Sequence, residues 1–141
     1  MKNLLAGLSV LFLSATAAQA AEVYLSCELN DHPLQIAVDR DNLSVKIRRP
    51  TGNSEEIRNG WVHQVVVRFW DDKATYRHTD MVAATPDKVS FSYHAKCLEF
   101  IADGKPSVCE DHDFSAEIDR KTGMLSGTEW PEAVHCSPVR F

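Results

Sequence analysis

Apolar and polar residues alternate along much of this chain, and this pattern constrains the fold more than any other feature. In residues 89–95, for example, Val89, Phe91 and Tyr93 alternate with Ser90 and Ser92. Successive side chains of a β-strand point to opposite faces, so a period of two predicts a half-buried strand. The pattern recurs in six segments, at residues 23–29, 34–38, 43–47, 65–69, 89–95 and 114–118.

Short turn-forming stretches separate these segments. Asn59-Gly60 is the strongest single hairpin signal among them. The short spacings leave little room for crossover helices, so neighbouring strands are expected to pair antiparallel. Residues 80–84 fit a strand least well and are interpreted as a short helical turn. The predicted fold is all-β. It is a small antiparallel meander of about eight strands, either a barrel or a sandwich, and it is cross-linked by disulfides.

The first twenty residues have the three parts of a secretory signal peptide. Lys2 supplies a positive start, residues 4–13 form an apolar run, and Ala18-Gln19-Ala20 is a small-residue cleavage pattern. The apolar run is too short to cross a bilayer. We expect cleavage after Ala20, export to the periplasm without a membrane anchor, and a single β domain over residues 21–141.

The charge of the mature chain argues against nucleic acid or anionic lipid as a partner. Removal of Lys2 leaves 14 basic and 20 acidic residues, a net charge of −6. The basic residues Lys46, Arg48 and Arg49 are interpreted as the exposed face of a strand.

Four cysteines remain after cleavage. In an exported chain an even number predicts disulfides, and four cysteines allow three connectivities. We favour Cys27 with Cys136, which would tie the first strand to the C-terminal segment, and Cys97 with Cys109, which would close a local loop.

A zinc site is the chemical alternative for two of these cysteines. His94 and Cys97 form a His-x2-Cys pair, and Cys109 and His112 form a Cys-x2-His pair. Such pairs can supply four ligands to one tetrahedral zinc ion. An oxidising compartment favours the disulfide instead, because a disulfide offers no thiolates. No cofactor is therefore expected.

Three tryptophans could contact a partner. Trp61 and Trp130 are interpreted as core and rim packing. Trp70 is predicted to share a face with Val66, opposite Val65 and Val67, and these two form the candidate partner patch.

An early cysteine, alternating strands, the hairpin-like segment 118–127 and a late cysteine occur together in this chain. In these features it resembles the small proteobacterial periplasmic β proteins that have no assigned activity. It is also similar in size and disulfide use to small periplasmic barrels that inhibit lysozyme. The resemblance implies a periplasmic β fold and transfers no functional residues.

The sequence leaves three classes of function open. The first is a non-catalytic binding or interaction protein that holds a small apolar ligand inside the barrel or docks an unknown protein. The second is a zinc-binding protein that uses His94, Cys97, Cys109 and His112. The third is an inhibitor or a small enzyme of the cell envelope, for which spacing assigns no catalytic residues.

Overall fold

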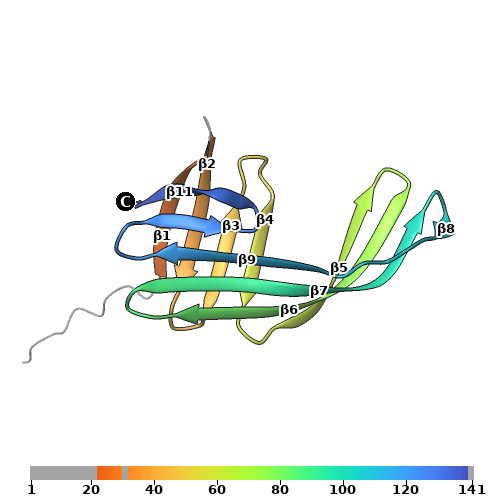
Figure 1. Cartoon of the computed structure of the whole chain (residues 1–141), viewed down its shortest axis with the longest axis horizontal. Coiled ribbons are helices and arrows are strands. Elements are labelled where there is room, and N and C mark those ends of the chain that lie inside the picture. Colours follow the sequence, from red (N-terminus) through yellow and green to blue (C-terminus); the bar gives the residue numbers. More distant parts are fainter. Residues whose placement is uncertain (1–21, 30–31, 140–141) are drawn as a thin grey trace, which may run out of the picture.

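The computed structural model describes residues 22–29 and 32–139, and this part of the chain forms one antiparallel sheet of eleven strands without a helix (Figure 1). The predicted signal peptide lies outside the described residues. The strands are β1 (Glu22–Leu29), β2 (His32–Asp39), β3 (Ser44–Arg48), β4 (Ser54–Arg58), β5 (Val62–Phe69), β6 (Asp72–Ala84), β7 (Lys88–Ala102), β8 (Lys105–Pro106), β9 (His112–Asp119), β10 (Met124–Gly127) and β11 (Trp130–Pro138). Their order in the sheet is β4-β3-β2-β1-β11-β10-β9-β7-β6-β5, and β8 pairs with β7.

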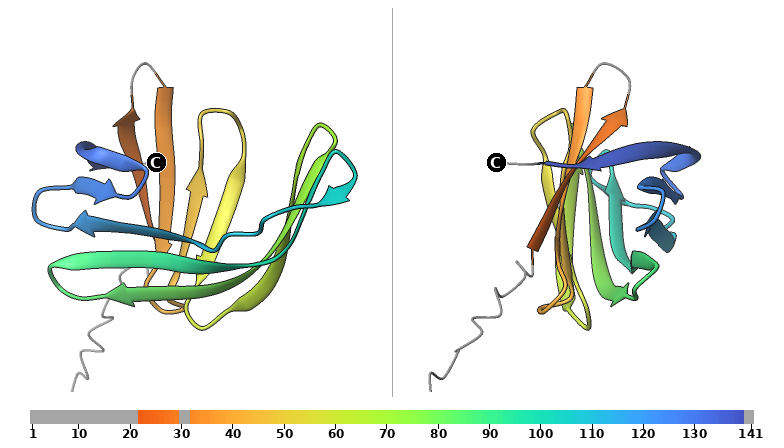
Figure 2. Two further views of the ribbon diagram at one scale, coloured as in Figure 1. Left: turned by 45° about the vertical axis from the view of Figure 1, so that its right-hand side comes forward. Right: turned by 90° about the vertical axis from the view of Figure 1, so that its left-hand side faces the viewer.

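The sheet curls into a half-barrel. Strands β1–β4 stand side by side as one wall, while β6, β7 and β9 run across them as the facing wall (Figures 1 and 2). The two walls meet through an apolar core. Its largest fully buried side chains include Phe91 from one wall and Leu34, Ile36, Ile47 and Ile57 from the other.

Aspartates at two strand ends stabilise hairpin turns, between β2 and β3 and between β9 and β10. The Asp39 carboxylate accepts hydrogen bonds from the main-chain N–H groups of Asp41 and Asn42, both at 3.0 Å. Asp119 does the same at the end of β9 with Lys121 and Thr122, at 2.8 and 2.9 Å. These hydrogen bonds hold the pKa of both carboxyl groups below its usual range.

The first and last strands pair in the middle of the sheet. β1 and β11 align Leu25 with Pro138 and Cys27 with Cys136, and a disulfide joins the two cysteines. Both cysteines are buried in the core. This junction connects the β1–β4 wall to the rest of the sheet, as the sequence-based pairing predicted.

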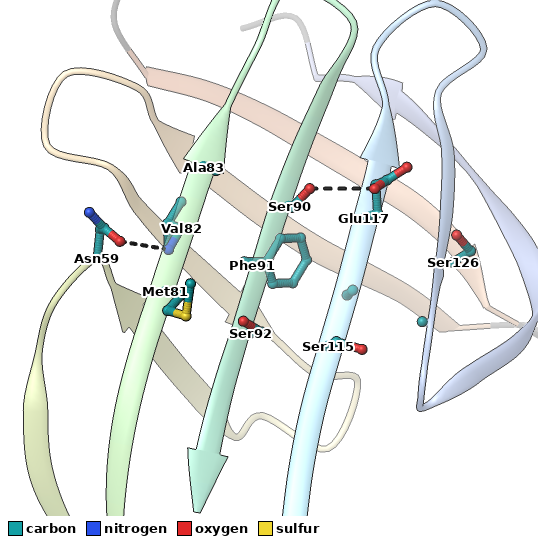
Figure 3. A pocket seen from close by; sticks show the side chains of 12 residues that line it. Asn59, Met81, Val82, Ala83, Ser90, Phe91, Ser92, Ser115, Glu117 and Ser126 are labelled. Atoms are coloured by element: carbon teal, nitrogen blue, oxygen red, sulfur yellow. Dashed lines mark hydrogen bonds between the residues drawn. The ribbon is translucent and has the colours of Figure 1, made fainter.

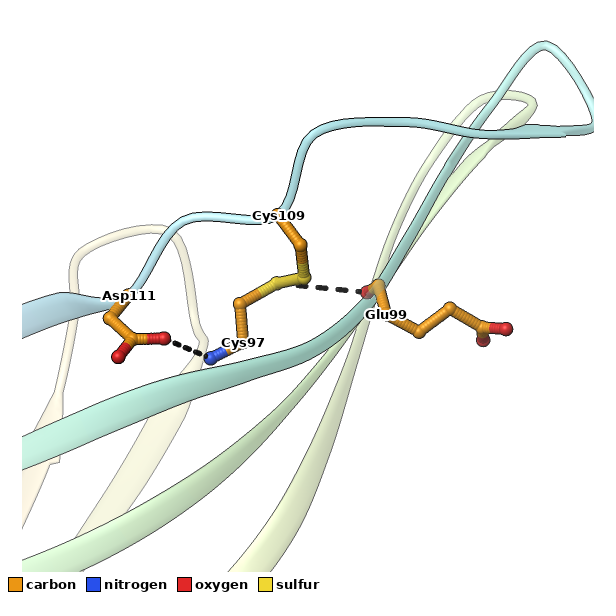
Figure 4. The surroundings of a disulfide bond; sticks show 4 residues. All are labelled: Cys97, Glu99, Cys109 and Asp111. Carbon is orange, nitrogen blue, oxygen red and sulfur yellow. Dashed lines mark hydrogen bonds between the residues drawn. A yellow bond between two sulfur atoms is a disulfide. The ribbon is translucent and has the colours of Figure 1, made fainter.

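Part of the sheet projects beyond the half-barrel as an arm (Figures 1 and 2). The arm consists of β5, the first half of β6 (residues 72–77), the second half of β7 (residues 96–102) and β8. At its base the predicted Cys97–Cys109 disulfide ties β7 to the segment that leads into β9 (Figure 4). The Asp111 carboxylate reinforces this tie by accepting the Cys97 main-chain N–H at 2.8 Å.

Three details of the prediction are corrected by the structure. The all-β antiparallel class holds, but the count of about eight strands was too low, and the sheet is a half-barrel rather than a closed barrel or sandwich. Residues 80–84 continue β6 instead of forming a helical turn. Asn59-Gly60 turns the chain between β4 and β5, which lie at opposite ends of the strand order and do not form a hairpin.

The pairing of the cysteines is consistent with an oxidising compartment and therefore with export, since none of the described cysteines is free. No described helix is long and apolar enough to cross a membrane.

Loss of the Cys27–Cys136 disulfide should destabilise the protein more than loss of Cys97–Cys109. The two bridges span 109 and 12 residues. The chain-entropy model gives about 5 kcal/mol for the long loop and about 3 kcal/mol for the short one. Urea unfolding of the two double Cys→Ala variants would test this order, and a larger loss from the Cys97/Cys109 variant would contradict it.

Gly127 should not tolerate a methyl group. A Cβ atom at this position would lie 2.3 Å from the Ser115 carbonyl oxygen and 2.8 Å from the Ala116 Cα, both in the backbone of β9. We expect Gly127→Ala to cost about 1 to 3 kcal/mol of unfolding free energy. Ser126→Ala, at an exposed neighbouring position, is the control. Equal unfolding midpoints for the two variants would contradict this expectation.

Candidate functional site

The outer face of the arm places like charges directly opposite each other. Arg68 of β5 pairs in register with Lys73 of β6, and Arg77 of β6 pairs with Lys96 of β7. Directly opposed like charges destabilise an antiparallel pair. Lys73 lies 3.8 Å from the Glu99 carboxylate, whereas Arg68, Arg77 and Lys96 have no acidic partner among the described residues. The fold itself therefore gives no reason for this arrangement.

Apolar side chains accompany these cations. Val66 is exposed on the face opposite Val65 and Val67, as its position in the alternation predicts. Trp70 does not share that strand face: it lies in the turn after β5, with a φ of 50° and its side chain fully exposed. Phe69 beside it is 66% exposed. The predicted patch of Val66 and Trp70 thus combines a strand face with a hairpin tip.

The zinc alternative is contradicted by the geometry of its four residues. Cys97 and Cys109 are joined to each other and supply no thiolate. His94 and His112 lie on opposite faces of the sheet, because His112 is in register with Ala95, the neighbour of His94. His94 is exposed and its Nδ1 lies 2.7 Å from the Asp113 carboxylate.

A different group of metal-binding residue types gathers at the base of the arm, on the inner face. His63 of β5 lies directly opposite His78 of β6, and Asp80 follows two residues later on the same face. One potential ligand atom from each of the three lies within 4.8 Å of the others. They border a pocket of about 260 Å³ that is also lined by Glu55 and Tyr93.

Neighbouring groups hold each of these side chains in place. Trp61 stacks on the His63 ring with centroids 3.8 Å apart, and Tyr93 stacks on His78 at 4.3 Å. The Arg58 main-chain N–H donates to one oxygen of Asp80 at 3.2 Å. The other Asp80 oxygen, Oδ1, and the His63 Nδ1 are buried, and no described residue forms a hydrogen bond with either.

Burial dominates the electrostatics of this inner cluster. Burial lowers the pKa of His78 to about 4, with help from His63 and His112, so the ring is neutral at physiological pH. Burial also raises the pKa of Asp80 and of Glu55 above their ordinary values. The nearby cation Arg49 is paired with Glu55 and Glu129, at 3.1 and 2.9 Å, rather than with Asp80.

A second hollow, of about 520 Å³, lies over β6, β7 and β9 (Figure 3). Short hydroxyl side chains, including Ser90 and Ser92, line it. Its one acidic group, Glu117, is paired with Lys88 at 2.9 Å. Among the described residues that line the hollow, Glu117 is the one acid–base group, and its charge is already paired.

The inner cluster was not predicted from the sequence, because residues 72–84 were not expected to form a strand. His78 and Asp80 follow a period of two, and His63 continues the alternation of Val65 and Val67. The signal was present in the spacing, but only the register of β5 against β6 shows that His63 faces His78. Trp130, by contrast, is buried in the core as predicted, and Trp61 is a partly exposed rim residue.

Comparisons with protein-family models, with curated proteins and with solved structures found no match for this chain.

Alkaline pH should destabilise the protein through Tyr93. Burial, reinforced by the charges of Glu55 and Glu129, raises the pKa of Tyr93 from 10.0 to about 12. The unfolded chain therefore loses this proton first, and stability that is fully present below pH 10 declines as the pH rises towards 12. Denaturant unfolding across this range should show a shallower decline for Tyr93→Phe than for the wild type. Parallel pH profiles would contradict this assignment.

Proposed function

We propose that this chain is a periplasmic protein, cleaved after Ala20, that acts without catalysis by binding a protein partner through the outer face and tip of the arm. The partner is expected to present an acidic surface beside an apolar groove. Opposite charges on the two surfaces would steer association, and the apolar groove would accept Trp70.

The observation that carries this proposal is the unpaired basic face of the arm. Arg77 and Lys96 lie side by side with no acidic partner among the residues that the structure describes, in a protein whose net charge is negative. Such a pair costs folding free energy, so a benefit outside the fold is the simplest reason to keep it. An acidic partner would supply the missing counter-charges.

The exposed Trp70 at the tip of the arm supports the same proposal. Trp70 makes no aromatic contact with the described residues, and its positive φ places it in a conformation that residues other than glycine rarely adopt. Tryptophan is enriched among the residues that dominate binding energy at protein interfaces. A fully exposed Trp70 is therefore better explained by binding than by folding.

A protein partner is favoured over a small apolar ligand inside the barrel. The inside of the half-barrel is filled by its own side chains, among them Phe91, Leu125 and Ile47, each below 2% exposed. A ligand would have to displace well-packed core residues, which is costly. Binding at the surface of the arm requires no such change.

Neutralising the arm should remove binding without loss of stability. In Arg77→Gln/Lys96→Gln the repulsion disappears, so the unfolding free energy should stay equal or rise by about 0.2 to 1 kcal/mol. Partner capture is measured with a photo-reactive phenylalanine analogue at Val66, in periplasmic extract of the producing bacterium. The double variant should lose most of the specific cross-linked adduct.

The matched control is Lys46→Gln/Arg48→Gln, which removes the same charge from exposed positions of β3, away from the arm. This control should keep the adduct. An adduct that survives the arm variant, or that both double variants lose equally, would overturn the proposal, because net charge alone would then explain capture.

A further inference from the structure

We propose that His63, His78 and Asp80 form a binding site for one divalent first-row transition-metal cation, of which Zn²⁺ is the probe. This site is separate from the partner-binding face, since it lies on the inner face of the sheet. Its donors differ completely from the His94, Cys97, Cys109 and His112 set that the structure contradicts.

Strand geometry brings the three donors to one point. His63 and His78 are a directly opposed pair on neighbouring strands, and Asp80 lies two residues beyond His78 on the same face. Side chains at such positions converge above one face of a sheet. Two strands are therefore enough to present two imidazoles and a carboxylate to a single ion.

The distances suit a shared ion better than direct contact. The His63 Nδ1 lies 3.9 Å from the Asp80 Oδ2, which also accepts the Arg58 N–H, and this distance is too long for a hydrogen bond. Two atoms that each lie about 2.1 Å from one zinc ion are at most about 4.2 Å apart. All three donors lie within 4.8 Å of one another, so they are expected to move slightly closer together when an ion binds.

Two buried polar atoms point to a missing cation. The Asp80 Oδ1 and the His63 Nδ1 have no hydrogen-bond partner within the described part of the chain, although the Asp80 side chain is wholly buried. A buried carboxylate without a counter-charge is unfavourable, and buried charges in proteins are usually paired or bound to metals. A divalent cation between these atoms would satisfy both.

The groups around the donors act as an outer shell. Trp61 and Tyr93 stack on the two imidazoles, and the Arg58 N–H binds the Asp80 Oδ2 and so orients the carboxylate. Residues that contact the ligands rather than the metal orient those ligands. The nearby pocket leaves space for water or an exogenous ligand at a further coordination position.

The donor types decide the class of metal. Two imidazoles with one carboxylate suit zinc, copper, nickel and iron, whereas calcium and magnesium prefer sites made of oxygen alone. We therefore expect Zn²⁺ and Co²⁺ to bind and Mg²⁺ and Ca²⁺ not to compete.

The test uses the oxidised mature protein after chelator treatment. Isothermal titration should show one Zn²⁺ per chain, and Co²⁺ should give visible absorption without the sulfur-to-metal charge-transfer band of a thiolate site. Zn²⁺ should also raise the melting temperature. His63→Ala and Asp80→Asn should each weaken Zn²⁺ binding by at least about tenfold.

The control is His135→Ala, which removes an exposed histidine outside the cluster and should bind Zn²⁺ as the wild type does. Because a buried substitution can disturb the fold, imidazole nitrogen spectra of the wild-type protein give an independent readout: Zn²⁺ should shift the signals of His63 and His78. Absence of binding to the folded wild type would overturn the proposal. So would binding that follows His94 or His135, or that both cluster variants retain.

Discussion

The pairing of β1 with β11 is the interaction on which the rest of the sheet depends. In the strand order, the ladder of β2–β4 continues to the other strands through β1, and β1 joins them through β11. That junction has three register pairs, one of which is the disulfide-linked pair Cys27 and Cys136. The covalent bond thus lies at the point where separation would divide the sheet into two pieces, each with half a core.

The inner cluster of His63, His78 and Asp80 depends on the curl of the sheet, which brings the end of β4 against β6. The end of β4 meets β6 without forming a ladder, and polar groups bridge the seam. The Arg58 N–H contacts the Asp80 carboxylate, and the Asn59 side chain accepts the Val82 N–H at 3.2 Å. In a closed barrel, the main-chain N–H groups of Arg58 and Val82 would instead pair with a neighbouring strand. The half-barrel instead leaves Asp80 facing a pocket, next to two histidines.

Local patterning could predict much of the fold but little of the site. The alternation identified the strands around Phe91 and Phe114 because each strand has one buried and one exposed face. It missed β4, whose sequence Ser54–Arg58 has one fully buried apolar residue, Ile57, among charged ones. The cluster of His63 with Asp80 depends on register between strands and on curl, and a single sequence does not encode either in its local spacing. The two cysteine pairings were easier to predict, because four cysteines allow only three connectivities.

The central position of β1 and β11 has a consequence for how the chain reaches this structure. Cys27 and Cys136 are separated by 109 residues, yet they belong to adjacent strands. A sheet whose middle is built from two segments so far apart in the sequence has high contact order, and such topologies fold slowly. β1 cannot pair with its final neighbour until β11 is available. Closure of the middle of the sheet is therefore expected to be a late step of folding.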